Sequence, residues 1–266
     1  MPLFGSVLPH VAVVELWGVI GGGVRSSEYA RIFNALGQNA MVRAVVVDID
    51  SPGGTATASD YLYGALERLG RRKPVVAFVR GTAASGAYLV SCAATRIVAI
   101  PSAIVGSIGV ISVRPVLREL LARVGVQVFV RKTGPFKDMW AFYREPTDEE
   151  QQKIQGLLEE FHEHFVTTVA QTRRLEPARA REYATGEVFT ARRGLELGLV
   201  DELGDLDVAL ERATELAKVP RRVVYVRPRR PLLERLAYRG SRALVRAVAV
   251  EIERRLFPEF YYRSYR

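Results

Sequence analysis

The 266-residue sequence contains little of what metal sites and disulfide bonds require. Its single cysteine, Cys92, excludes an intrachain disulfide, and its position in an apolar run predicts a core side chain. Only three histidines are present, and His162 and His164 lie two residues apart on a predicted helix, so that they point in different directions. We therefore expect neither a metal site nor a bound cofactor.

A long apolar run is also missing. Pro9, His10 and Glu15 interrupt the apolar stretch near the N-terminus, which is far short of the roughly 20 apolar residues that span a bilayer. No basic segment precedes this stretch, which argues against a signal peptide. We therefore expect a protein that is cytoplasmic or attached peripherally to a membrane.

Net positive charge is confined to the C-terminal end of the chain. The formal net charge is +9, and residues 221–266 account for all of it, with 13 arginines against four glutamates. Residues 1–220 are neutral overall, and 48% of the whole chain is hydrophobic, which is enough for a substantial core. The distribution predicts a globular domain over 1–220 and a basic extension over 221–266.

The basic extension has the pattern of an amphipathic helix. Four arginines share one stripe and apolar residues occupy another face: Arg235, Arg239, Arg242 and Arg246 against Leu233, Leu236, Ala237, Leu244 and Val248. Helices of this kind lie on anionic membrane surfaces, which predicts such a contact through residues 230–257. The alternative is a helix that packs on a neighbouring subunit. The tyrosines cluster at the end of the extension, which argues against nucleic acid binding.

Strands and helices alternate through the globular part. The expected strands are 11–16, 42–49, 74–79, 96–100 and 126–130. The expected helices are 26–36, 55–69, 83–92, 114–124, 147–173, 177–183, 191–197 and 205–218, and Thr147 with Glu150 forms a capping box. Gly81 is expected to end the third strand. This alternation predicts an α/β fold with a largely parallel sheet flanked by helices.

Three loops of this pattern carry unusual chemistry. They are the Pro-Gly-Gly turn at 52–54, the strand-to-helix turn with Ser85, and the turn with Lys137. Loops at the carboxyl ends of parallel strands gather in one crevice. There a serine can attack a carbonyl, a neutral lysine can accept its proton, and glycine amides can hold the oxyanion. The apolar neighbours of Lys137 favour the desolvation that a neutral lysine needs.

Other interpretations of these residues remain open from the residues alone. Ser85 is equally compatible with a serine that caps a helix among small neighbours. Lys137 is also compatible with a surface ion pair to Asp138 or Glu145. A Ser-His-Asp triad is the competing catalytic arrangement, but the three histidines lie before the first strand or on the long helix. We therefore rank the serine–lysine dyad above the triad.

Five segments, in order and at suitable separations, resemble the signal peptide peptidase A family, serine–lysine peptidases of the ClpP/crotonase fold. They are DSPGG at 50–54, AASGAY at 83–88, GSIGV at 106–110, GPFKD at 134–138 and GLVDELG at 198–204. The resemblance covers residues 11–218. It implies a ClpP/crotonase-like fold, and it implies that the domain 1–220 hydrolyses extended apolar peptides, such as remnant signal peptides, at or near a membrane.

The resemblance also implies roles for particular residues. These are Ser85 as nucleophile, Lys137 as general base, Gly54 with Gly53 and Gly86 at the oxyanion hole, and Ser107 as a hydroxyl that positions the lysine amine. It further implies a homo-oligomeric ring in which the serine and lysine meet across a subunit boundary. The sequence departs from the family by having Ala87 where a second glycine is usual, and by showing no N-terminal anchor.

Two other classes of function stay open at this point. One is a crotonase-like protein that binds acyl-CoA, although residues 1–220 show no evident basic cluster for its phosphates. The other is a non-catalytic scaffold at a membrane.

Overall fold

The computed structural model describes residues 8–228. The chain divides into two compact units, Met1–Val226 and Arg227–Arg266. The predicted amphipathic helix at 230–257 lies outside the described residues, so the expectation for it stays a prediction. Within residues 8–228, no helix is both long enough and apolar enough to span a membrane.

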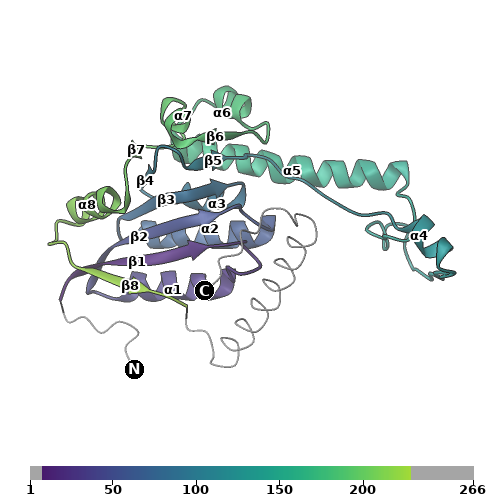
Figure 1. Cartoon of the computed structure of the whole chain (residues 1–266), viewed down its shortest axis with the longest axis horizontal. Helices are drawn as coiled ribbons and strands as arrows, with labels where there is room; N and C mark the ends of the chain where they lie inside the picture. The colour runs from purple at the N-terminus through teal and green to yellow at the C-terminus, as the bar shows by residue number, and fades with distance from the viewer. Residues whose placement is uncertain (1–7, 229–266) are drawn as a thin grey trace, which may run out of the picture. The chain divides into compact units, whose positions relative to one another are not determined.

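A single mixed sheet organises the first unit (Figure 1). Its strands are β1 (His10–Trp17), β2 (Val42–Ser51), β3 (Val75–Ala84), β4 (Arg96–Ala99), β5 (Ile104–Gly106), β6 (Val188–Thr190), β7 (Glu202–Leu203) and β8 (Val223–Val226). The order is β6-β5-β3-β2-β1-β8, with β4 beside β3 and β7 beside β4. Every pairing is parallel except that of β5 with β6, which confirms the largely parallel sheet.

Strand β3 changes partner part-way along its length. Its residues 76–79 pair with β4, whereas residues 82–84 pair with β5. Gly81 lies at the change, and a Cβ atom there would be 2.7 Å from Asp50 Oδ1. The expectation that Gly81 ends the strand is wrong, because the strand bends to its second partner and continues to Ala84.

Helices cover both faces of the sheet. They are α1 (Ser26–Gln38), α2 (Ala56–Gly70), α3 (Gly86–Ser91), α4 (Arg118–Arg123), α5 (Asp148–Arg173), α6 (Pro177–Tyr183), α7 (Ala191–Glu196) and α8 (Leu206–Ala217). Helix α5 begins with the predicted capping box: Thr147 Oγ1 accepts from the N–H of Glu150, and the Glu150 carboxylate accepts from the N–H of Thr147.

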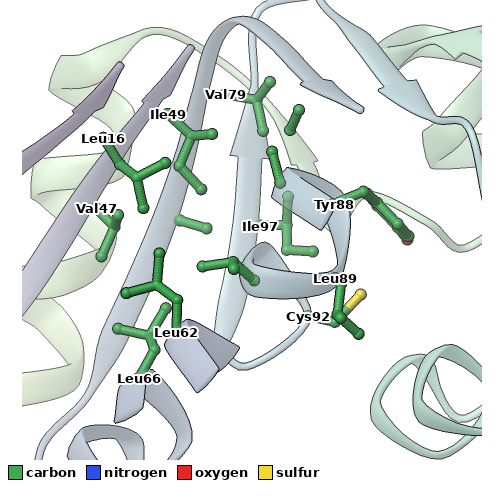
Figure 2. Packing of buried hydrophobic residues seen from close by; sticks show 14 of the residues in the cluster. Leu16, Val47, Ile49, Leu62, Leu66, Val79, Tyr88, Leu89, Cys92 and Ile97 are labelled. Atoms are coloured by element: carbon green, nitrogen blue, oxygen red, sulfur yellow. The ribbon is translucent and has the colours of Figure 1, made fainter. Parts of the chain in front are cut away.

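Alternate side chains of the central strands enter two separate cores. In β2, Val45, Val47 and Ile49 face the core formed with α1, α2 and α3. Val46 faces the opposite core, which α8 closes with Leu210. Figure 2 shows the larger core, where Leu16, Val47 and Ile49 of the sheet lie among side chains of α2 and α3, including Leu62, Leu66 and Leu89. Because both faces are covered, the strands read as continuous apolar runs.

A buried ion pair fixes the 198–204 segment. The Arg173 guanidinium, with only 7% of its side chain exposed, donates to both carboxylate oxygens of Asp201 at 2.7 and 3.0 Å. Asp201 also accepts from the N–H of Ile97 on β4. Tyr88 of α3 donates its hydroxyl to Leu199 O at 2.9 Å. These contacts join α3, α5 and β4, and so hold the start of α3 in place.

Residues 111–147, here called the arm, join β5 to α5. No residue from 111 to 140 is buried. Helix α4 is shorter than expected, and the predicted strand at 126–130 is wrong: these residues have no regular secondary structure because no neighbouring strand pairs with them. In Figure 1, α4 lies at the end of α5 that is distant from the sheet.

Candidate active site

Ser85 occupies a strained turn between the end of β3 and the start of α3. Its φ of 51° lies in the left-handed region, which residues other than glycine rarely adopt. Its N–H donates to Gly106 O at 2.8 Å, and its carbonyl accepts from the N–H of Leu89 at 3.0 Å. The side chain makes no capping hydrogen bond to the helix, although Ser85 is the N-cap residue. The hydroxyl is therefore not committed to helix capping.

The glycine turn after β2 lies directly against Ser85. Gly53 has a φ of 97°, and a Cβ atom on it would be 3.0 Å from Ser85 Cβ and 2.8 Å from the amide nitrogen of Gly86. The turn is held by the N–H of Ile20, which donates to Gly53 O at 2.8 Å. Gly54 is packed just as tightly, since a Cβ atom there would lie 1.8 Å from Ile20 O. Neither position can carry a side chain without moving backbone.

Two backbone N–H groups beside Ser85 remain available. Within residues 8–228, the N–H groups of Gly54 and Gly86 have no hydrogen-bond partner. They are close to each other, because a Cβ atom on Gly86 would lie 3.6 Å from the Gly54 nitrogen. Preorganised amides next to a nucleophile are what a developing oxyanion requires.

The residues that follow Ser85 are packed against α2. A Cβ atom on Gly86 would lie 2.0 Å from Ser59 Oγ and 2.7 Å from Ser59 Cβ, so glycine is needed there. Ala87, the departure from the family pattern, is fully buried in the larger core. Its methyl group therefore packs inside this core.

Ser107 directly follows Gly106, whose carbonyl accepts the hydrogen bond from the N–H of Ser85. Gly106 and Ser107 both have positive φ, 98° and 51°. The N–H of Ser107 donates to Glu187 O at 2.7 Å, which fixes the backbone at this point. The structure therefore brings Ser85, the Gly53-Gly54 turn, Gly86 and Ser107 together at one end of β3.

Lys137 lies elsewhere, in the part of the arm between α4 and α5. Its side chain is exposed, and within the described residues it takes part in no hydrogen bond, ion pair or ring contact. The surface ion pair considered for it is not formed, because Asp138 binds Lys132 and Arg144 instead. In Figure 1 this part of the chain is distant from α3. The expected common crevice is therefore not formed within one chain, since a long arm carries the lysine beyond the sheet.

The remaining nucleophiles and possible ligands are accounted for. Burial raises the pKa of the Cys92 thiol to about 11, as befits a core residue. His162 Nε2 lies 2.9 Å from Ala184 O, and His164 Nε2 lies 2.8 Å from Asp60 Oδ1. No group of three or more potential metal ligands occurs among residues 8–228.

Comparison with known proteins decides the family. The pattern of Peptidase family S49 matches residues 67–220, more than half of the chain. The chain belongs to peptidase family S49. A Synechocystis sp. protein named as a protease, slr0021, is 38% identical over 216 residues, which are 81% of this S49 chain and 77% of that protein. Protease 4 of Salmonella typhi is 36% identical over 208 residues, 77% of this chain and 32% of protease 4.

A solved structure shares the fold of this S49 peptidase. It is the 1510-N membrane-bound stomatin-specific protease, with a lysine replaced by alanine and a substrate peptide bound. The TM-score is 0.58 at 16% identity, over 87% of this chain and 97% of that chain. The chain is thus a serine peptidase with the expected ClpP-like fold, and the resemblance to the signal peptide peptidase A family is confirmed.

Proposed function

We propose that this S49 peptidase hydrolyses peptides with a dyad of Ser85 and Lys137. The observation that carries the proposal is the strained Ser85 turn, beside which the N–H groups of Gly54 and Gly86 have no hydrogen-bond partner within residues 8–228. The Ser85 hydroxyl attacks the scissile carbonyl while a neutral lysine amine takes its proton. The amides of Gly54 and Gly86 hold the oxyanion. Lysine returns the proton to the leaving amine, and water then hydrolyses the acyl-enzyme by the same steps.

The lysine of this dyad comes from a second copy of the chain. Lys137 is exposed, and the part of the arm between α4 and α5 that carries it is distant from α3, the helix that follows Ser85 (Figure 1). The arm also exposes large apolar side chains that a neighbouring copy would cover: Ile111, Val113, Leu120, Val124 and Phe129, from 55% to 88% exposed. Such contacts would exclude water from the amine, as a neutral lysine requires. Repetition of this contact around an axis gives a closed ring. Ser107 is then placed to orient the incoming amine.

The substrates are extended apolar peptides, such as remnant signal peptides, at or near a membrane. Exposed apolar residues lie in the segments that adjoin the site, with Val19 next to the Ile20–Gly54 bridge and Ile111 just beyond Ser107. The proposal of a peptide substrate is supported by the 1510-N protease, which shares the fold and has a substrate peptide bound. The basic residues at 230–257 would hold the ring at an anionic surface.

A serine-reactive fluorophosphonate probe tests the dyad. Wild type should be labelled and should cleave an unstructured apolar peptide, whereas Ser85→Ala should do neither. Lys137→Met should be labelled far more slowly while unfolding at the same temperature. Mixing Ser85→Ala with Lys137→Met should restore part of the activity, because a mixed ring contains some complete sites. Full activity of Lys137→Met alone would refute the proposed base, and no recovery on mixing would refute its supply by a second copy.

The membrane contact is tested separately. Full-length protein should pellet with anionic liposomes, and protein lacking residues 221–266 should remain in the supernatant. Equal pelleting of both would refute a contact through the extension.

A further inference from the structure

The turn that carries Lys137 has no core to hold it. Residues 134–141 form successive tight turns, with Lys137 N donating to Gly134 O at 3.2 Å and Ala141 N donating to Asp138 O at 2.9 Å. No residue from 111 to 140 is buried and Ala141 is the one buried residue of this turn, so apolar packing within residues 8–228 does little to fix it. Its geometry therefore depends on polar contacts.

Asp138, the residue after Lys137, is the centre of these contacts. Its carboxylate accepts from Lys132 Nζ at 2.6 Å, from the Tyr143 hydroxyl at 3.0 Å, and from Arg144 Nε and Nη2 at 3.1 and 2.9 Å. The hydrogen bonds from Arg144, and then those from Lys132, hold the pKa of Asp138 well below its usual range. Both carboxylate oxygens are occupied, so the carboxylate leaves the neighbouring Lys137 amine free.

Arg144 connects this carboxylate to helix α5. Its guanidinium donates to Glu150 Oε1 at 2.5 Å and to Oε2 at 2.8 Å, in addition to Asp138. The Glu150 side chain is only 2% exposed and also closes the capping box with Thr147. Charge-assisted, forked hydrogen bonds of this kind fix direction as well as distance. At its other end, α5 is anchored in the core by residues such as Phe165.

Two further contacts hold the same turn. Arg114 Nη1 donates to Met139 O at 2.6 Å, on the other side of Lys137 from Gly134. The Lys153 ammonium of α5 lies over the ring of Phe136, 4.9 Å from its centroid. The residues on both sides of Lys137 are thus bound, while the lysine side chain itself is not.

We infer that Asp138, Arg144 and Glu150 form a positioning chain that sets the direction of Lys137 from the N-terminus of α5. The inference rests on the proposed function, because it assigns these residues to the proposed base. They touch neither substrate nor Ser85 in this chain, and they act through the backbone of the lysine turn. A lysine base misplaced by about 1 Å loses on the order of a hundredfold in rate.

The test compares Arg144→Met with a matched control, an arginine that pairs with another glutamate of helix α5. Arg181 forms an exposed forked pair with Glu163 of α5, at 2.7 Å for both hydrogen bonds. Peptide hydrolysis by Arg144→Met should lose about ten- to a hundredfold in kcat with KM within about twofold, whereas Arg181→Met should match wild type. Arg144→Lys keeps the positive charge but cannot donate paired hydrogen bonds to each carboxylate, and its kcat should lie between those of Arg144→Met and wild type.

The decisive measurement is the rate of Ser85 labelling by the fluorophosphonate in the Lys137→Ala background. If Arg144 acts only through the lysine, Arg144→Met should cause no further loss of the labelling rate in that background. A further loss in that background, or a kcat for Arg144→Met equal to that of Arg181→Met, overturns the positioning chain and leaves the dyad intact. Wild-type hydrolysis by Lys137→Ala instead overturns the dyad itself, together with this inference.

Discussion

Gly86 provides the sharpest test of how the Ser85 turn is built. A Cβ atom at this position would lie 2.0 Å from Ser59 Oγ and 2.7 Å from Ser59 Cβ, far inside van der Waals contact. Gly86 is not one of the residues with positive φ, so the backbone itself accepts alanine. Overpacking of a filled site costs about 1–3 kcal/mol. The gain of a helical alanine over glycine offsets about 0.5–1 kcal/mol of this.

The clash involves only one side chain, so a second substitution should relieve it. Ser59→Gly removes both clashing atoms, and the next contact of the new methyl is the Gly54 nitrogen at an ordinary 3.6 Å. Ser59→Gly alone should destabilise by about 1 kcal/mol, since it places glycine inside α2. Gly86→Ala combined with Ser59→Gly should then escape the overpacking cost and be about 0.5–1 kcal/mol more stable than Ser59→Gly alone, which implies a favourable coupling of about 1–3 kcal/mol. Ser59→Ala removes only Oγ and should rescue less.

Urea unfolding of the four proteins at one protein concentration measures this coupling, and peptide hydrolysis reports whether the turn is restored. We expect Gly86→Ala to have a lower unfolding midpoint and much reduced activity, and the double variant to regain part of both. If the two substitutions were additive, or if Gly86→Ala unfolded like wild type, the packing described around Ser85 would be refuted.

Three other predictions follow from the same geometry. Gly54→Ala would place a methyl group 1.8 Å from a backbone oxygen and displace a proposed oxyanion donor. Its kcat should therefore fall about 10²–10³-fold. Gly156 has open space around it, so Gly156→Ala serves as the control and should keep wild-type activity. Ellman's reagent should modify Cys92, whose burial raises its pKa to about 11, only after unfolding. The pKa values of Asp138 and Glu150 are depressed in the folded protein, that of Glu150 to about 2. The ion pairs of the arm should therefore be intact above about pH 4 and should break as the pH falls toward 2. The rate of pepsin cleavage within residues 111–147, normalised to the rate for an unfolded substrate at each pH, measures this change.

Local chemistry was enough to predict strands β1 to β4 and most helices, whereas the short strands β5 to β8 were not expected. The β-branched run of β2 and the capping box at Thr147 each act within a few residues, and each appears where the pattern indicated. The strained turn of Ser85 was also foreseeable, because a serine between small residues follows a buried strand. These features can be predicted from the local sequence because they do not depend on residues that are distant along the chain.

Features that depend on distant partners were not predictable. Gly81 looks like a strand end in sequence, but β3 continues because β5 supplies a second partner. The valines at 126–130 look like a strand, but no strand lies beside them. Arg144 was missed as a functional candidate, and the only signal for it is its position two residues before the helix-opening Pro-Thr pair. In the proposed assembly, Lys137 meets Ser85 of a second chain, and such a contact between chains leaves no local signal in one sequence.

The two halves of the proposed site are stabilised by different interactions, and this difference has a functional meaning. Ser85 and its glycine amides are fixed by backbone hydrogen bonds and by two cores, so their geometry is as stable as the fold itself. Lys137 lies in a turn that is held by local backbone hydrogen bonds and charged contacts, on an arm without a buried residue from 111 to 140. Under the proposed dyad, an isolated chain would have a nucleophile without a base. Activity would then depend on assembly, and folded neighbours would be protected from cleavage until the arm is covered.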